Sequence, residues 1–153
     1  MKNKILTAFA CVIALSQSVL AAQNDPLVGT WKTIDDRTGY SLADVVIKKD
    51  EKTQQYSATI INTRSVPGAI PTERCTQCTG KTKNQPLVGL ETLSGLVAVP
   101  GKNNEFRHGQ WLDPNNGQYY DARARLMSNG KHLVIHSSAA QSSVGRNFTW
   151  VKN

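Results

Sequence analysis

Apolar and polar residues alternate at a period of two along most of this 153-residue chain. The stretch Gln118–Leu126 is the clearest case, because Tyr120, Ala122, Ala124 and Leu126 fall on one face and charged residues fall on the other. Such alternation is typical of a half-buried β-strand, and no segment of helical length has a 3.6-residue period. The pattern therefore predicts an all-β fold.

The alternating segments predict about eight strands. They are Leu27–Ile34, Tyr40–Lys48, Gln55–Asn62, Leu87–Val99, Glu105–Leu112, Gln118–Leu126, His132–Ser138 and Arg146–Lys152, the fourth with a break suggested at Gly95. Most connections are short and rich in Asn, Asp and Gly, as in hairpins. Consecutive antiparallel strands of this number favour an up-and-down barrel, because closure removes exposed sheet edges. We therefore expect a single β-barrel domain over residues 23–153.

Residues 1–22 have a different character: two lysines precede an apolar run too short to cross a bilayer, which ends at Ala21 and Ala22. This is the pattern of a cleavable signal peptide, cut near either alanine, so the protein is expected to be periplasmic or secreted, without a transmembrane segment in its mature form. Without Lys2 and Lys4, the 18 basic residues fall to 16 against 11 acidic ones, a net charge of +5. These basic residues are scattered, which does not favour nucleic-acid binding.

The mature chain keeps two cysteines, Cys75 and Cys78, in a C-x-x-C motif within the long connection Ser65–Pro86. The motif is compatible with a disulfide, a redox centre or part of a metal site. Export favours the disulfide. No helix is predicted beside the pair to lower a thiol pKa, and a structural zinc site needs about four ligands. We therefore expect a disulfide that stiffens this loop, with thiol–disulfide oxidoreductase as the third-ranked function.

Catalytic motifs are lacking in the sequence: it contains no H-E-x-x-H, glycine-rich phosphate loop or Ser-His-Asp order. His132 and His136 fall on one face of a single predicted strand, which favours a solvated surface over a metal site. The sequence thus predicts no catalytic residues, metal or cofactor, and favours a non-enzymatic protein.

The two terminal strands suggest how the barrel closes. Gly29 to Trp31 reads G-x-W, and Arg146 shares a face of the last strand with Phe148 and Trp150. This combination resembles the lipocalin and fatty-acid-binding superfamily, so Arg146 is expected to stack on Trp31 and close one end. Inward-facing alanines either leave room for a small ligand, with Trp111, Tyr120 and Phe148 as its candidate lining, or let bulky neighbours such as Phe148 pack in a barrel filled by its own side chains.

Four phrases resemble, in order, one family of exported bacterial proteins known as domain of unknown function twenty-one forty-seven. They are "GTWKTIDDRTG", "CTQCTGKTKNQPLVGLETLSGL", "GQWLDPNNGQYYDARARL" and "GRNFTWVK". The resemblance implies a calycin-like barrel without an established activity. The chain departs from the family at "DEKTQQ", where a glycine-rich turn is usual, and at the unusually polar "SSAAQSSVGR".

Two further functions follow from these features. The first is binding of a small apolar or amphipathic molecule inside the barrel. The alternative is an interaction module that recognises an envelope protein through the clamped loop of residues 65–86.

Overall fold

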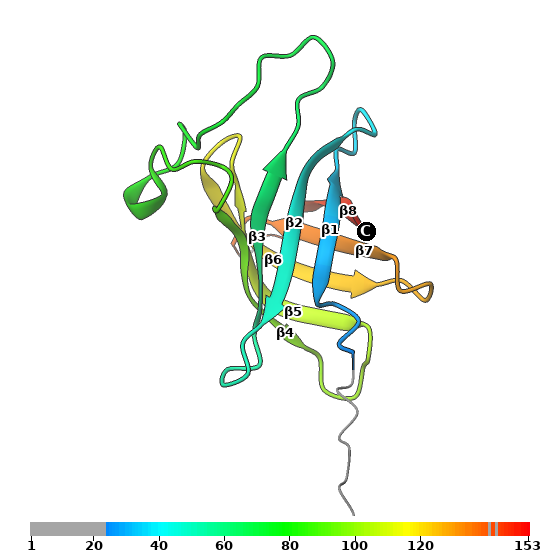
Figure 1. Cartoon of the computed structure of the whole chain (residues 1–153). Helices are drawn as coiled ribbons and strands as arrows, with labels where there is room; N and C mark the ends of the chain where they lie inside the picture. The colour runs from blue at the N-terminus through cyan, green and yellow to red at the C-terminus, as the bar shows by residue number, and fades with distance from the viewer. Residues whose placement is uncertain (1–23, 141, 143) are drawn as a thin grey trace, which may run out of the picture.

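The computed structural model describes residues 24–140, 142 and 144–153, which form a closed barrel (Figure 1). Each strand pairs antiparallel with the next in sequence, and β8 returns to pair with β1. The strands are β1 Gly29–Ile34, β2 Ser41–Lys49, β3 Tyr56–Thr63, β4 Glu91–Ala98, β5 Glu105–Asp113, β6 Gln118–Leu126, β7 His132–Ser138 and β8 Gly145–Lys152. One turn of 3-10 helix, η1 Gly80–Thr82, lies between β3 and β4. The predicted up-and-down barrel is confirmed.

The predicted strands agree with the observed ones except near the long connection. The fourth begins at Glu91, later than expected, because Leu87 and Gly89 donate backbone hydrogen bonds to Glu73 and Ile60 instead. Gly95 causes no break, since its positive φ of 67° is accommodated inside β4. The predicted signal peptide, residues 1–22, lies outside the described residues. In the part of the chain that the structure describes, no helix is both long and apolar enough to cross a membrane.

The alternation along β6 and β7 separates a packed interior from a polar exterior. On β6 the buried side chains are Ala122, Ala124 and Leu126, as expected, while the charged residues between them are exposed. β7 follows the same rule, with Leu133 and Ile135 inside and both predicted outward histidines on the opposite face. Large aromatic side chains fill much of the interior, including the fully buried Trp31 and Trp150.

One end of the barrel, which we call the closed end, is covered by residues 24–28. The Trp31 indole N–H donates to the carbonyl of Leu27 at 2.9 Å, and Leu27 itself is fully buried. Asp25 accepts hydrogen bonds from the Tyr56 hydroxyl at 2.7 Å and from Lys49 Nζ at 3.3 Å. The segment therefore joins β1, β2 and β3 at this end.

The cation over Trp31 is Lys152, so the predicted pairing of Trp31 with Arg146 is wrong. Lys152 Nζ lies 5.2 Å from the Trp31 ring centroid and donates to the carbonyl of Pro26 at 2.6 Å. The strand register explains the difference: Trp31 is directly opposite Lys152 in the β1–β8 pair. Arg146 stands six positions earlier, near the other end of β8, which is too far along the strand to reach Trp31.

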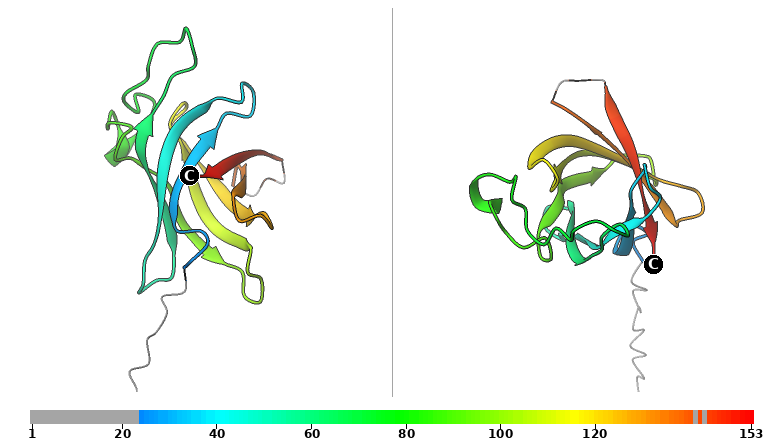
Figure 2. Two further views of the ribbon diagram at one scale, coloured as in Figure 1. Left: turned by 45° about the vertical axis from the view of Figure 1, so that its right-hand side comes forward. Right: turned by 90° about the horizontal axis from the view of Figure 1, so that it is seen from above.

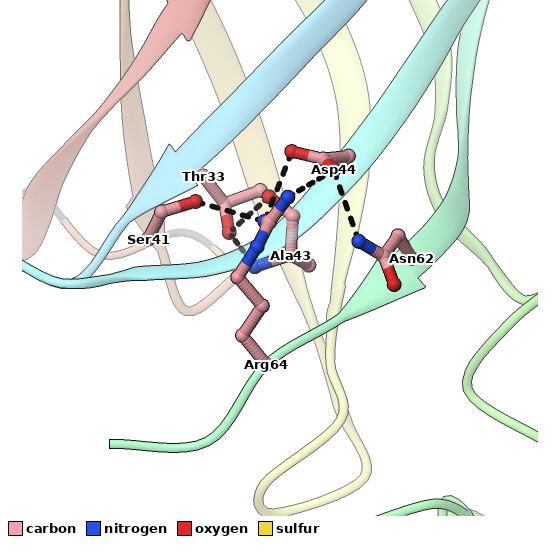
Figure 3. A network of polar contacts seen from close by, with 6 residues as sticks. All are labelled: Thr33, Ser41, Ala43, Asp44, Asn62 and Arg64. Carbon is pink, nitrogen blue, oxygen red and sulfur yellow. Dashed lines mark hydrogen bonds and ion pairs between the residues drawn. The ribbon is translucent and has the colours of Figure 1, made fainter. Parts of the chain in front are cut away.

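The opposite end, which we call the mouth, carries the long connection between β3 and β4 (Figures 1 and 2). Arg64 anchors its start: the guanidinium pairs with Asp44 of β2 and also donates to Ser41 at 3.1 Å (Figure 3). Asn62 donates to the same carboxylate at 3.2 Å. The Arg64 hydrogen bond, with smaller help from Asn62, holds the pKa of Asp44 below its usual value.

Cys75 and Cys78 form the predicted disulfide, and both are buried. Around them the loop is a small hairpin. Arg74 and Pro86 form an isolated antiparallel β-bridge, and the Cys75 amide donates to the carbonyl of Gln85 at 2.9 Å. Leu112, which alternation places on the outer wall of β5, is only 1% exposed and belongs to the same buried cluster as Cys75, Cys78 and Leu87 of the loop. The loop therefore adds an apolar layer to the outside of the barrel wall. We call the hairpin, residues 73–87, the clamped loop.

The clamped loop lies against the β5–β6 turn at Gly117. A Cβ atom on Gly117 would come within 2.1 Å of the Gln77 carbonyl oxygen and 2.7 Å of the Cys78 amide nitrogen. The glycine also has a positive φ of 69°. A side chain at this position is thus excluded both by the backbone conformation and by the docked loop.

Replacing Asp25 by asparagine is expected to lower the free energy of unfolding by about 1–2 kcal/mol at pH 7. Burial raises the Asp25 pKa, but hydrogen bonds from Tyr56, Leu27 and Lys49 outweigh it and bring the pKa below the unfolded value of 3.8. The carboxylate therefore contributes stability above pH 3.8, and loses it as the pH falls through the folded pKa. Urea unfolding across this range measures the difference. Asp36→Asn, on an exposed turn, is the control, and a loss for Asp25→Asn that did not shrink in acid would contradict the account.

Gly117→Ala is expected to undock the clamped loop, whereas Gly130→Ala is not. Both glycines have positive φ values, 69° and 65°, so backbone strain should lower the free energy of unfolding of both variants by about 1 kcal/mol. A Cβ on Gly130 meets nothing within 4 Å, so only Gly117→Ala adds a collision. Amide hydrogen exchange should show lost protection at Cys75 and Leu87 in Gly117→Ala alone. Equal protection in the two variants would show that the loop does not rest on this turn.

Candidate functional site

The three predicted lining residues meet at the mouth. Trp111 of β5 and Phe148 of β8 pack with ring centroids 4.6 Å apart, and Tyr120 of β6 lies 5.8 Å from Trp111. β5 and β8 are not neighbours in the sheet, so Trp111 and Phe148 make their contact across the barrel interior. The sequence thus identified residues that do come together, and their binding role stays a prediction.

Arg146 completes this group with a positive charge. Its guanidinium carbon is 5.7 Å from the Trp111 ring centroid and 6.0 Å from that of Phe148. Arg146 alternates with Phe148 and Trp150 along β8 and is opposite the buried Ser137 of β7, so it belongs to the inward face. Unlike those neighbours, Arg146 is exposed. Among the described residues it forms no ion pair, which leaves the guanidinium open to solvent at the mouth.

The mouth and the closed end differ in what occupies the inward positions. Near the closed end these are large side chains such as Trp31, Trp150 and Phe106. Toward the mouth they include the small side chains of Ala43, Ala122 and Ser137 beside the aromatic group. Asn116, on the β5–β6 turn, donates to the Tyr120 hydroxyl at 2.9 Å and so fixes the half-buried tyrosine at the rim. The mouth therefore offers an aromatic platform, a fixed hydroxyl and a cation.

The clamped loop and the segment leading into it form a second exposed surface, beside the mouth. Arg74, Lys81 and Lys83 are exposed on it, and Ile70, just before the hairpin, is 92% exposed. The disulfide sulfurs are not part of this surface, since Cys75 and Cys78 are only 0% and 2% exposed. Thiol exchange would need an accessible sulfur, so the geometry does not favour the oxidoreductase hypothesis.

Metal binding has no support at either surface. Within residues 24–140, 142 and 144–153, His, Cys, Asp and Glu side chains nowhere form a group of three or more that could hold a metal ion. His136 instead makes a 2.8 Å hydrogen bond to Asn147 on β8, and His132 makes one to Asn129.

The alternation along the last strand indicates the correct face for Arg146, but its predicted partner, Trp31, is wrong. The signal that could have located it is its position at the start of the last strand, two residues before Phe148. Antiparallel pairing puts that start beside the end of the preceding strand, at the mouth. The role of Asp25 had no signal in the sequence, because it depends on contacts with Lys49 and Tyr56, which lie 24 and 31 positions later in the chain.

Comparisons with known proteins support the fold and identify the family of the chain. A solved structure described as "Protein HP1028 from the human pathogen Helicobacter pylori belongs to the lipocalin family" is similar, with a TM-score of 0.66 and 23% identity over 83% of this chain and 82% of that one. No curated protein matches the chain. Residues 29–152, which cover the whole barrel, match the model of the family described as "Uncharacterized protein conserved in bacteria (DUF2147)". The chain therefore belongs to this family of uncharacterized bacterial proteins.

Proposed function

We propose that this protein binds a small amphipathic molecule with an anionic head group at the mouth of its barrel. The observation that carries the proposal is Arg146, an exposed guanidinium on the inward face, stacked over Trp111 and Phe148 and without an ion pair among the described residues. A ligand's carboxylate or phosphate would pair with the guanidinium, because such charge-assisted hydrogen bonds are strong and geometrically selective.

The apolar part of the ligand would lie on the aromatic platform. Trp111 and Phe148 present flat apolar surfaces, and Tyr120 adds a ring held at the rim by Asn116. Ligand sites in proteins commonly combine an apolar lining with a few fixed polar groups, and the mouth of a β-barrel is a frequent place for them. The lipocalin-like fold, shared with the Helicobacter pylori protein, supports this choice.

The chain's N-terminal pattern extends the proposal to a compartment. Residues 1–22 have the charged start, the short apolar run and the small terminal residues of a signal peptide. A disulfide between Cys75 and Cys78 persists in an oxidising environment such as the periplasm or the exterior. We therefore place the binding activity in the bacterial envelope or outside the cell.

The second candidate is recognition of an envelope protein through the clamped loop. The observation that favours it is the rigid seating of this loop: a buried disulfide, a small hairpin and the contact at Gly117 hold a basic surface in one conformation. Preorganised loops lose less conformational entropy on binding. It ranks second because nothing on the loop defines the chemistry of a partner as clearly as Arg146 defines an anion.

Decanoate and decanol, which share an apolar chain and differ in head-group charge, test the proposal. We expect decanoate to bind saturably, with a change in tryptophan fluorescence, and Arg146→Gln to weaken it about tenfold or more, as for the loss of a charged hydrogen bond. Decanol should bind more weakly and lose little affinity in the variant. Isothermal titration calorimetry gives both affinities.

Arg107→Gln is the matched control, since Arg107 is exposed on the outer face of β5. It should leave decanoate binding unchanged. Equal affinity of wild type and Arg146→Gln for decanoate would refute the proposed role of the mouth.

A further inference from the structure

A groove of about 540 Å³ lies on the outer wall of the barrel, over β5, β6 and β7. Its side chains are His108, Gln110, Asp121, Arg123, His136, Ser138 and Ser142, and Gly109 and Ala122 also line it. Every one of these seven side chains is polar or charged. They project away from the interior, so the groove is separate from the mouth site.

The groove depends on a bulge in β5. The β5–β6 register shifts between Phe106 and Gly109, so that Arg107 and His108 together oppose Arg123 of β6. His108 takes a positive φ of 63°, which is uncommon for a residue with a side chain. Without the bulge, alternation from the buried Phe106 would point His108 inward. The bulge turns it outward instead, as bulges often do where a side chain has to be re-aimed.

Cross-strand pairing arranges the groove in two rows. The first row is Gln110, Asp121 and Ser138, which are directly opposite one another on neighbouring strands. The second row contains Arg123 beside His136 of β7, with His108 at the bulge on the other side of Arg123. One row thus carries a carboxylate, and the other carries a guanidinium between two imidazoles.

Asp121 and Arg123 are two residues apart on one face of β6, a spacing of about 7 Å. Despite their opposite charges, neither forms an ion pair or a side-chain hydrogen bond with any of the residues that the structure describes. The groove therefore presents a negative and a positive group, both exposed to solvent and separated by a fixed interval.

His136 is also held in place. Its Nδ1 is 2.8 Å from Asn147 Oδ1 on β8, and this hydrogen bond fixes the orientation of the ring. The Nε2 atom lies over Gly145, where a Cβ would come within 2.8 Å of it. A glycine at this position thus leaves space for the imidazole beside Arg123.

We propose that this groove binds a zwitterionic molecule of dipeptide length, with its anionic group at Arg123 and its ammonium group at Asp121. An extended dipeptide spans about 7 Å, which matches the spacing of two residues along a strand. Gln110 and Ser138 flank Asp121 and supply hydrogen-bond partners for the same end of the ligand. The site takes a peptide-like ligand, a class different from the amphipathic molecule at the mouth.

Three probes test separately the anionic and the ammonium group of the proposed ligand. Glycylglycine carries both, N-acetylglycine carries only the anion and glycinamide only the cation. In amide-resolved NMR titrations, we expect glycylglycine to shift the resonances of Arg123, His136 and Ser138 saturably, and each singly charged probe to bind about tenfold more weakly or worse. If N-acetylglycine or glycinamide binds as well as glycylglycine, the groove is a simple ion site and the zwitterion proposal is wrong.

Arg123→Gln and Asp121→Asn should each weaken glycylglycine about tenfold or more. Arg125→Gln is the matched control: Arg125 lies two residues further along the same face of β6, outside the groove, and pairs with Glu105 at 2.9 Å. It should leave the affinity unchanged. These side chains are all exposed, so the variants are expected to fold. Two results would overturn the proposal. One is an affinity for glycylglycine equal to that of the wild type in all three variants, and the other is resonance shifts located at the mouth instead of the groove.

Discussion

The pairing of β1 with β8 is the constraint on which the rest of the molecule depends. Residues Trp31 to Ile34 pair with Thr149 to Lys152, and this pairing leaves the sheet without a free edge. Closure gives every strand one face toward the interior, so the alternation of the sequence becomes a core and a polar wall. It also fixes position along the axis: Lys152 is placed over Trp31, and Arg146 is carried to the mouth.

The two ends then differ in chemistry. At the closed end, the carbonyl of Leu27 accepts a hydrogen bond from the Trp31 indole N–H. Asp25 accepts hydrogen bonds from Tyr56 and Lys49 at the same end. At the mouth, Arg146 remains exposed over Trp111 and Phe148, and the clamped loop lies beside the rim without contributing a partner to that guanidinium. The family has no established activity, so this difference between the ends is the physical basis for looking for a ligand at the mouth.

Period-two alternation was sufficient to predict the strands and the faces of β6 and β7, because these depend on local sequence. The barrel was predicted from the number of consecutive strands and the need to remove exposed sheet edges. The disulfide followed from spacing and expected compartment. The register of the β1–β8 pair was not predictable, which is why Arg146 was assigned to Trp31 in place of Lys152. The bulge at His108 and the contacts of Asp25 also escaped prediction, since they depend on residues far apart in sequence. Consequently the sequence indicated the aromatic group of Trp111, Tyr120 and Phe148, whose binding role stays a prediction, but it did not indicate the groove.

Hydrogen exchange of the tryptophan indole protons tests most directly whether one end is closed and the other open. The Trp31 indole donates to Leu27 in a fully buried site, whereas Trp111 is 8% exposed at the mouth. We expect the Trp31 proton to exchange only when the whole barrel unfolds, and the Trp111 proton to exchange much faster from the folded state. Exchange of Trp31 as rapid as that of Trp111 in the folded protein would contradict it.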